Sequence, residues 1–294
     1  MTQKDIRNLV LKAIYLDDTL SELMVLKGGS AIAMLRMTER ESFDLDFSLL
    51  EISIEDKDRL EELFREAITS YFNEEEFVVF SFKFKEKPKV ADTSKPDWGG
   101  YHISFKFLPE EIYENTIART REQTQIQALS TEFDKFIGTK EAVKIELSKK
   151  EFVSKFESIE VDDVEIKLYS AEMIIFEKLR AICQQMPEYK ERNKKAKRAR
   201  DFFDIVTVNS KINLEKTEEK EKKELGVLLQ NIFKIKNVPL NFLHDIDKYR
   251  EFHRDNFKSV EDSLYTHERT RLKEYDFYVD ETIKLVNWIL KELI

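Results

Sequence analysis

The stretch LKGGSAIAMLRMTERESFDLDFSLL, residues 26–50, contains two strand patterns separated by a turn and a short helix pattern. The apolar run LMVL at 23–26 predicts the first strand, and SAIAMLRM at 30–37 has the apolar spacing of a helix. The alternating run SFDLDFSLL at 42–50 predicts a half-buried second strand. This order predicts a domain that mixes strands and helices.

The glycine pair between the first strand and the helix has the composition of an anion site. The first amides of the helix point into the turn, with Ser30 as the expected cap, and amides at a helix N-terminus attract anions. Gly28 and Gly29 lack Cβ atoms, so a phosphate can approach the backbone, and Lys27 adds positive charge. The same residues are compatible with a turn that glycine merely permits, because the stretch is neither a Walker A sequence nor GxGxxG.

The second strand places two aspartates on one face. Its phenylalanines and leucines face a core, whereas Asp44 and Asp46 face the other way. Two carboxylates beside an apolar core repel each other, and a hard cation that prefers oxygen ligands, such as Mg²⁺, relieves this repulsion. The alternative is an amphipathic strand with one wet face.

A later strand pattern, AVKIELS at 142–148, adds a third carboxylate. Glu146 shares a face with Lys144 and Ser148, opposite to the apolar residues of this strand. If this strand is a neighbour of the strand at 42–50, Glu146 joins the two aspartates.

Strand patterns end near residue 170, and helical periodicity continues from there to the C-terminus. We therefore predict an α+β fold in two domains, a mixed sheet domain at residues 1–168 and an all-helical domain at 169–294. The other predicted elements are strands at 76–84, 101–107 and 164–170, a hairpin loop at 86–100, helices at 3–18 and 55–72, and a polar helix or insertion at 109–135.

Composition excludes several classes of protein. The chain has 294 residues, of which 41% are apolar and 36% charged, and no apolar run approaches the length that crosses a bilayer. Its N-terminus lacks the pattern of a secretory signal, so we expect a cytoplasmic protein. Cys183 is the single cysteine, which excludes an internal disulfide and a multi-cysteine zinc site. The net charge of −9 disfavours nucleic-acid binding by the chain as a whole, although a local basic patch can still bind it.

Four ordered blocks, LKGGSAIAMLR, RESFDLDF, VKIELSKKE and EKLRAI…KRARDFFDI, resemble the nucleotidyltransferase AbiEii/AbiGii toxin family. This family belongs to the DNA polymerase β-like nucleotidyltransferases and forms the toxin half of type IV toxin–antitoxin and phage-abortive systems. The resemblance covers roughly residues 20–208. It implies a nucleotidyltransferase-like catalytic domain followed by a helical domain.

The resemblance implies an Mg²⁺-dependent enzyme, with Mn²⁺ as the other candidate metal, that transfers a nucleoside monophosphate from an NTP to an acceptor and releases pyrophosphate. Asp44, Asp46 and Glu146 are the expected metal ligands and catalytic acids. The expected acceptor is RNA, in particular the tRNA 3′ end, and the expected outcome is growth arrest or abortive phage infection. A cognate antitoxin is the expected partner, with direct contact left open.

The fourth block implies further site residues in the helical domain. By resemblance, Lys178 and Asp201 are candidate catalytic residues and Arg198 is a candidate phosphate contact. The family pattern has lysine where this chain has Arg198, which keeps the charge but changes the hydrogen-bond geometry. For Arg200 and Asp204 we favour an intrahelical ion pair without a catalytic role.

The run KERNKKAKRAR, residues 190–200, is the most basic part of the chain. It is either a solvated surface loop or a docking site for RNA phosphates, and the RNA acceptor that the resemblance implies favours the second interpretation. The candidate RNA-binding residues are Lys190, Arg192, Lys194, Lys195 and Lys197.

Two alternatives to transfer onto RNA stay open. One is the same chemistry on a protein or small-molecule acceptor, and the other is a regulatory module that binds GTP without turnover. The three carboxylates argue against the second, because binding alone does not need all of them. The sequence shows no sign of a self-complementary dimer patch, so a monomer is the default expectation.

Overall fold

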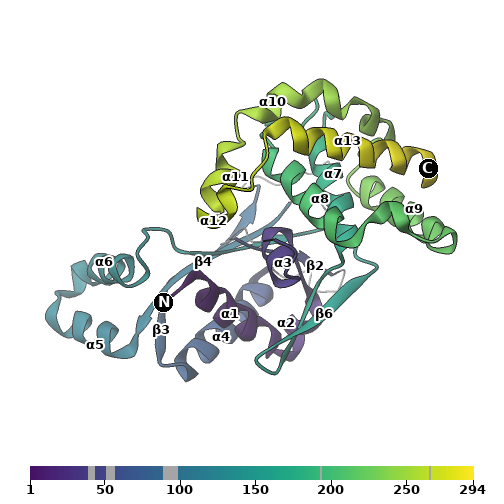
Figure 1. Cartoon of the computed structure of the whole chain (residues 1–294). Helices are drawn as coiled ribbons and strands as arrows, with labels where there is room; N and C mark the ends of the chain where they lie inside the picture. The colour runs from purple at the N-terminus through teal and green to yellow at the C-terminus, as the bar shows by residue number, and fades with distance from the viewer. Residues whose placement is uncertain (39–43, 51–56, 89–98, 193, 265) are drawn as a thin grey trace. The chain divides into compact units, whose positions relative to one another are not determined.

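The computed structural model describes residues 1–38, 44–50, 57–88, 99–192, 194–264 and 266–294. Packing divides the chain into two compact units, which are described separately (Figure 1). The first unit comprises Met1–Leu26, Phe43–Lys150 and Ser158–Leu168, and the second comprises Lys27–Ser42, Glu151–Glu157 and Tyr169–Ile294. The proposed domain boundary between residues 168 and 169 stays a prediction.

A seven-stranded mixed sheet with strand order β3-β4-β5-β2-β1-β7-β6 forms the centre of the first unit. β2 is parallel to β5, β1 is parallel to β7, and β4 is antiparallel to both β3 and β5. The prediction of an α+β fold is confirmed by this sheet and by the helices around and after it. The strands are β1 (Met24–Lys27), β2 (Leu45–Leu49), β3 (Phe77–Lys87), β4 (Gly100–Pro109), β5 (Val143–Ser148), β6 (Phe156–Val161) and β7 (Val164–Tyr169).

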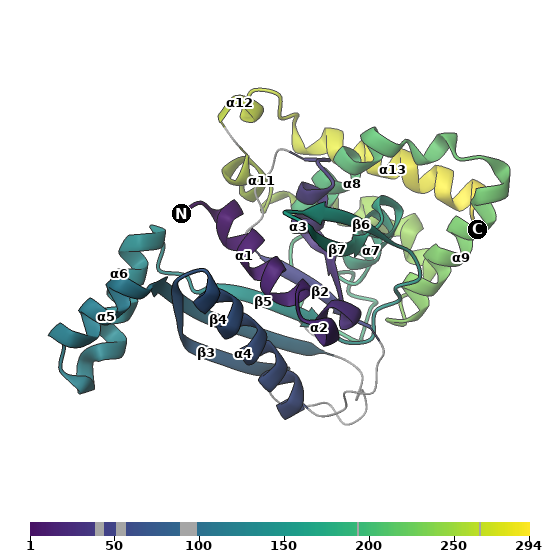
Figure 2. The same cartoon turned by 90° about the horizontal axis from the view of Figure 1, so that it is seen from below.

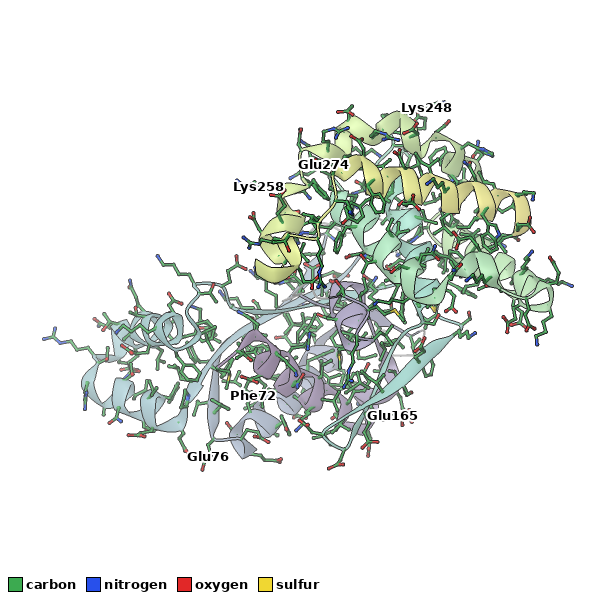
Figure 3. All side chains as sticks on the ribbon, viewed as in Figure 1. Phe72, Glu76, Glu165, Lys248, Lys258 and Glu274 are labelled. Atoms are coloured by element: carbon green, nitrogen blue, oxygen red, sulfur yellow. The ribbon has the colours of Figure 1, made fainter. Side chains whose placement is uncertain are left out.

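Helices α1 (Gln3–Tyr15) and α4 (Lys57–Glu74) lie across one side of this sheet (Figure 2). Apolar and polar residues alternate along the strands, because the apolar residues, such as Phe47 and Ile145, are completely buried on that side. Phe72 of α4, labelled in Figure 3, has its ring centroid 5.0 Å from that of Phe107 on β4. Aromatic packing of this kind fixes which face of the sheet is the core face.

The first unit differs from the sequence prediction at the end of the first helix and at β6. The helix expected at 3–18 ends at Tyr15, because Asp17 caps the separate helix α2 (Asp18–Leu23) through its hydrogen bond to the amide of Leu20. The stretch at 109–135 is helical, in line with the predicted polar helix or insertion, and forms α5 (Glu110–Arg119), the 3₁₀ turn η1 (Glu122–Thr124) and α6 (Gln125–Ile137). β6 was not predicted because its mostly exposed residues show no apolar alternation.

The ends of two other predicted elements lie outside the described residues. These are residues 42–43 of the second predicted strand and 55–56 of the predicted helix at 55–72. Residues 89–98 of the predicted hairpin loop are also outside them, but the antiparallel pairing of β3 with β4 confirms the hairpin.

The second unit is helical, as predicted for the C-terminal half. α7 begins after Ser170, whose hydroxyl accepts a hydrogen bond from the amide of Met173. Its elements are α3 (Gly28–Met34), α7 (Ala171–Cys183), α8 (Ala199–Ile212), η2 (Leu214–Lys216), α9 (Glu219–Lys234), η3 (Leu240–Tyr249), α10 (Arg250–Arg254), α11 (Lys258–Ser263), α12 (Thr266–Arg269) and α13 (Tyr275–Glu292).

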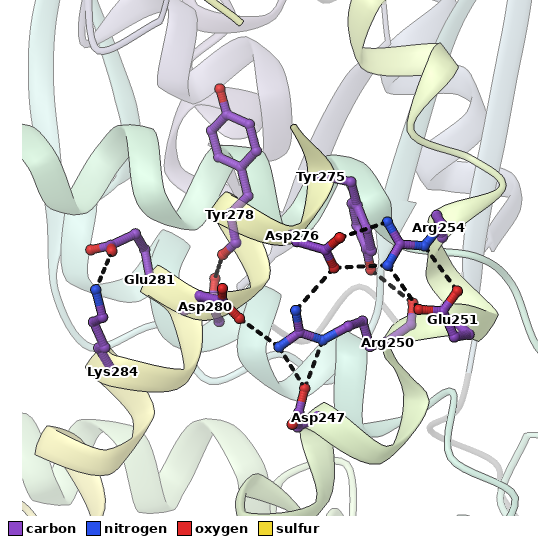
Figure 4. Close-up of polar contacts among 11 residues, drawn as sticks. Asp247, Arg250, Glu251, Arg254, Tyr275, Asp276, Tyr278, Asp280, Glu281 and Lys284 are labelled. Atoms are coloured by element: carbon purple, nitrogen blue, oxygen red, sulfur yellow. Dashed lines mark hydrogen bonds and ion pairs between the residues drawn. The ribbon is translucent and has the colours of Figure 1, made fainter. Parts of the chain in front are cut away.

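An arginine ladder joins α10 to α13 in this unit (Figure 4). Arg250 bonds to Asp247, Asp276 and Asp280, and Arg254 bonds to Glu251 and Asp276. These contacts tie η3 and α10 to the start of the last helix.

Among the helices of the described ranges, none combines the length and the apolar character that a bilayer crossing needs.

Candidate functional site

Acidic side chains lie on the face of the sheet opposite to the core. Asp46 on β2 pairs with Glu146 on β5 in parallel register, so the two residues stand side by side on the same face. Asp44 directly precedes β2 and is exposed. The two strands are thus neighbours, which is the condition for Glu146 to join the aspartates, although they are about 100 residues apart in the chain.

The carboxylate of Glu146 has a basic partner in this structure. Lys87 Nζ on β3 lies 3.0 Å from Glu146 Oε1, and the two side chains are 56% and 52% exposed. β4 lies between the strands of this ion pair, and its residue Gly100, which pairs with Lys87, has no side chain. A Cβ at Gly100 would collide with the carbonyl oxygen of Leu147, so glycine is required there. An ion pair this exposed contributes about 1 kcal/mol or less, and Glu146 can exchange it for another cation at little cost.

The acids offer the type of ligand atom that a magnesium site needs. Carboxylate oxygens are the ligands that Mg²⁺ prefers, and the register brings Asp46 and Glu146 together. Within the described residues, however, no group of three or more His, Cys, Asp or Glu side chains is arranged to hold a metal ion. Partial burial, and then Lys87, lower the pKa of His102, which pairs with Glu146 from β4.

The glycine turn starts the short helix α3 in the second unit. Gly28 has a φ of +70°, a conformation that residues with a Cβ rarely adopt. The helix already begins at Gly28 with Lys27 at the N-cap position, so the prediction that Ser30 caps it is wrong. Ser30 instead lies buried in the first turn. The first amides of α3 have no acceptor within the helix, as at any helix N-terminus.

Lys27 belongs to a buried charge cluster rather than to an open phosphate contact. Its Nζ lies 2.9 Å from Glu177 Oε1 and 3.4 Å from Glu151 Oε1. Glu151 also contacts Arg180 and Lys236, at 3.2 and 3.4 Å. Burial opposes the ionisation of Glu151, but these three cations outweigh it and lower its pKa to about 2. The cluster joins the start of α3 to α7.

A second buried cluster joins α7 to α8. Lys178 Nζ lies 2.9 Å from Asp201 Oδ1 and 2.7 Å from Asp204 Oδ2. Burial disfavours the charged lysine, but the two aspartates outweigh that effect and raise the pKa of Lys178. The structure therefore brings together Lys178 and Asp201, two of the residues that the sequence singled out. Arg198 lies at the edge of the cluster, with its Nη1 3.6 Å from Asp201 Oδ2.

His253 on α10 contacts the start of α8, next to this second cluster. Its Nδ1 accepts a hydrogen bond from the backbone amide of Arg198 at 3.0 Å, which helps to fix the start of α8. Burial lowers the pKa of His253 to about 4, so the imidazole is neutral at pH 7. Three buried atoms here, His253 Nε2, Asp201 Oδ2 and Arg198 Nε, have no hydrogen-bond partner among the described residues.

The predicted ion pair between Arg200 and Asp204 is wrong. Asp204 is only 1% exposed and turns inward to Lys178. Arg200 turns the other way and donates to the hydroxyl and carbonyl oxygens of Ser259. Helical spacing places Arg200 and Asp204 within reach of each other, but Asp204 pairs with the buried Lys178 instead.

The basic run at 190–197 makes local contacts. Lys195 donates to the carbonyls of Gln184 and Tyr189 and so covers the carboxyl end of α7. Lys190 and Arg192 also donate to backbone carbonyls, and Lys197 pairs with Asp255. The side chain of Lys194 makes no such contact with the residues that the structure describes. Whether this run binds RNA stays a prediction.

Sequence reasoning missed Glu151, Glu177, Arg180 and His253. The signal for two of them was present, because Glu177 and Arg180 interrupt an otherwise apolar helix pattern and such charges are buried only when paired. Glu151 lies in an irregular segment, where no periodicity marks a buried position. The glycine turn and the sheet acids belong to different units, and their meeting in one site stays a prediction.

A mixed sheet with paired acids on one face, in a chain whose remainder is helical, is the architecture expected of a nucleotidyltransferase. A family model described as the nucleotidyl transferase AbiEii toxin of type IV toxin–antitoxin systems matches residues 9–281. The chain belongs to this family. The predictions of family and of nucleotidyltransferase activity are thus confirmed, and family membership implies an NTP substrate and an antitoxin partner.

Two solved structures are distantly similar. One is a Helicobacter pylori protein assigned as a nucleotidyltransferase, with 16% identity and a TM-score of 0.47 over 99% of this chain and 94% of that one. The other is JHP933 from Helicobacter pylori, with 16% identity and a TM-score of 0.47 over 99% of this chain and 91% of that one. No curated protein matches the chain. The family assignment rests on the family match alone.

Proposed function

We propose that this nucleotidyltransferase transfers a nucleoside monophosphate from an NTP to a hydroxyl of an RNA acceptor, with pyrophosphate as the leaving group. The tRNA 3′ end is the proposed acceptor, and growth arrest or abortive phage infection in the cytoplasm is the proposed consequence. The pairing of Asp46 with Glu146 in neighbouring parallel strands is the observation that supports this proposal most strongly.

Asp44, Asp46 and Glu146 are the proposed metal ligands. A bound Mg²⁺ or Mn²⁺ would neutralise and orient the triphosphate. Glu146 is also the proposed acceptor of the proton from the attacking hydroxyl, which requires it to leave Lys87. The exposed position of that ion pair makes the exchange inexpensive.

In the second unit we propose phosphate contacts from the amides of Gly28, Gly29 and Ser30 and from Arg198. Lys27 contributes by holding the start of α3 to Glu177 and Glu151, rather than by direct contact. Lys178 acts through Asp201, because its ammonium group is fixed between two aspartates. Asp201 is the proposed catalytic residue of this pair.

The direct experiment offers each α-labelled NTP with Mg²⁺ to the protein together with total tRNA, with other RNA fractions, or with protein fractions. The proposal expects label in the tRNA fraction, and loss of that label in Asp46→Ala. The matched control is Asp58→Ala, because Asp58 is an exposed aspartate of the same unit at the start of α4.

Three other outcomes would contradict the proposal. Label in the protein fraction would replace the RNA acceptor by a protein. Binding of GTP without any labelled product would favour a regulatory module. Full transfer by Asp46→Ala would remove the sheet acids from the mechanism.

A further inference from the structure

A pocket of about 390 Å³ opens on the second unit. One wall is a single face of α8, where Phe203, Thr207 and Lys211 recur at helical spacing. The other walls are the residues that follow α3, the segment around α12 and the start of α13. None of the site residues predicted from the sequence lines this pocket.

The rim of the pocket is strongly basic. Arg36, Lys211, Arg271 and Lys273 line it together with one acid, Glu268, which lies 3.2 Å from Arg271. In the part of the chain that the structure describes, the side chains of Arg36, Lys211 and Lys273 have no ion pair. Three positive charges without an ion-pair partner among the described residues therefore line this pocket, in a chain whose net charge is −9. Such a cluster attracts anionic ligands.

This cluster differs from the basic run at 190–197 in what its side chains contact. Most cations of that run already bond to backbone carbonyls or to Asp255. A cation with a protein partner must release it before it can bind a phosphate, whereas the side chains of Lys211 and Lys273 have no ion-pair partner among the described residues. The pocket is the better phosphate site of the two.

The floor of the pocket is apolar and aromatic. Phe277, which is 42% exposed, lines it together with the buried residues Tyr278 and Phe203. An exposed aromatic ring beside cations is the combination with which proteins bind single-stranded nucleic acid, since bases stack on the ring and phosphates pair with the cations. The volume lies in the range of pockets that hold one small ligand.

We propose that this pocket binds a nucleotide unit of the single-stranded part of the RNA acceptor. Arg36, Lys211 and Lys273 contact its phosphates, and Phe277 stacks on its base. This inference rests on the proposed function in one respect only, namely that the acceptor is RNA. It adds a binding site that lies outside the acids and the glycine turn.

The test is equilibrium binding of a fluorescein-labelled single-stranded RNA of eight nucleotides, followed by anisotropy, with EDTA present and NTP absent. RNA binding is thus measured under conditions in which no nucleotide is transferred. A protein without transferase activity could therefore still show this binding. The variant is Lys211→Glu/Lys273→Glu. Its matched control is Lys216→Glu/Lys223→Glu, which changes the same charge at two exposed lysines of the same unit that do not line the pocket.

The pocket variant is expected to bind the RNA at least about tenfold more weakly, and the slope of log Kd against log salt should fall by about 1.4, or 0.7 for each lost phosphate contact. The control should stay within about twofold of the unchanged protein, as surface charges outside the site should. Phe277→Ala should weaken binding about tenfold without changing the salt slope, because it removes stacking alone.

Equal weakening by the two double variants would overturn the proposal in favour of general charge attraction. Competition by free GTP as strong as by RNA would make the pocket a free-nucleotide site instead. Competition by poly-glutamate at the same strength would point to an acidic protein partner, and it too would overturn the RNA assignment.

Discussion

Two lysine–carboxylate pairs in this protein have nearly the same length and opposite surroundings. Lys87 and Glu146 on the sheet lie 3.0 Å apart with side chains 56% and 52% exposed. Lys27 and Glu177 in the second unit lie 2.9 Å apart with side chains 9% and 16% exposed. Water screens the first pair and is largely excluded from the second, so distance alone does not decide what an ion pair contributes. The exposed pair is exchangeable, and the buried clusters fix the structure.

The largest effect on stability is expected at the buried cluster. Glu151→Ala leaves Lys27 and Arg180 with Glu177 as an acid and removes the ion pair between Glu151 and Lys236. Removing one partner of a buried ion pair costs about 3–5 kcal/mol, and we expect urea denaturation to show a loss of this size.

The control for this change is Glu157→Ala, because Glu157 is exposed on β6. Its free energy of unfolding should stay within about 0.5 kcal/mol of the unchanged protein. A loss below about 1 kcal/mol for Glu151→Ala would show that water reaches the cluster, and the contrast between the two regions would disappear.

The next effect concerns the pH dependence of stability. The pKa of His253 is about 4 in the folded protein and about 6.5 in an unfolded chain, so the unfolded state binds more protons between these values. Stability is therefore complete above about pH 7 and falls as the pH drops towards 4. At pH 5 this histidine should cost about 2 kcal/mol relative to pH 7.

His253→Gln tests this dependence, because the glutamine oxygen can accept the Arg198 amide and does not titrate. Urea denaturation at pH 7 and pH 5 should show a smaller difference for the variant than for the unchanged protein. Identical pH differences would mean that His253 has the same pKa in the folded and unfolded states, as an imidazole open to water does.

The smallest effect is expected on the sheet. Lys87→Met removes the exposed partner of Glu146, and the free energy of unfolding should change by no more than about 0.5 kcal/mol. High salt should reduce even this difference. A loss above about 2 kcal/mol would place the sheet pair among the buried ones.

Sequence pattern predicted the sheet well where apolar residues alternate, as in β2 and β5. Because the period of a strand fixes the face of every side chain, Asp46 and Glu146 could be placed on one face once their strands were known to be neighbours. Strand order itself depends on contacts between distant segments, and a single sequence does not encode it in a readable pattern.

The ion pairs among the buried charges of the second unit could not be predicted from sequence pattern. Helical spacing suggested that Asp204 pairs with Arg200, but burial between α7 and α8 gives it to Lys178. Glu151 and Lys236 meet from segments that share no periodic relation. Local spacing shows which residues can meet, and tertiary packing decides which of them do.

We propose that Asp46 and Glu146 act as one catalytic unit. The most direct test is a double-mutant cycle on the rate of nucleotide transfer, with Asp46→Asn, Glu146→Gln and the two combined. Each single change should lower the rate about 1000-fold and the combination should lower it little further, since residues that act together are not additive. Unfolding free energies should confirm that all three variants are folded. A Glu146→Gln variant that keeps the full rate, or losses that multiply in the double variant, would contradict the claim.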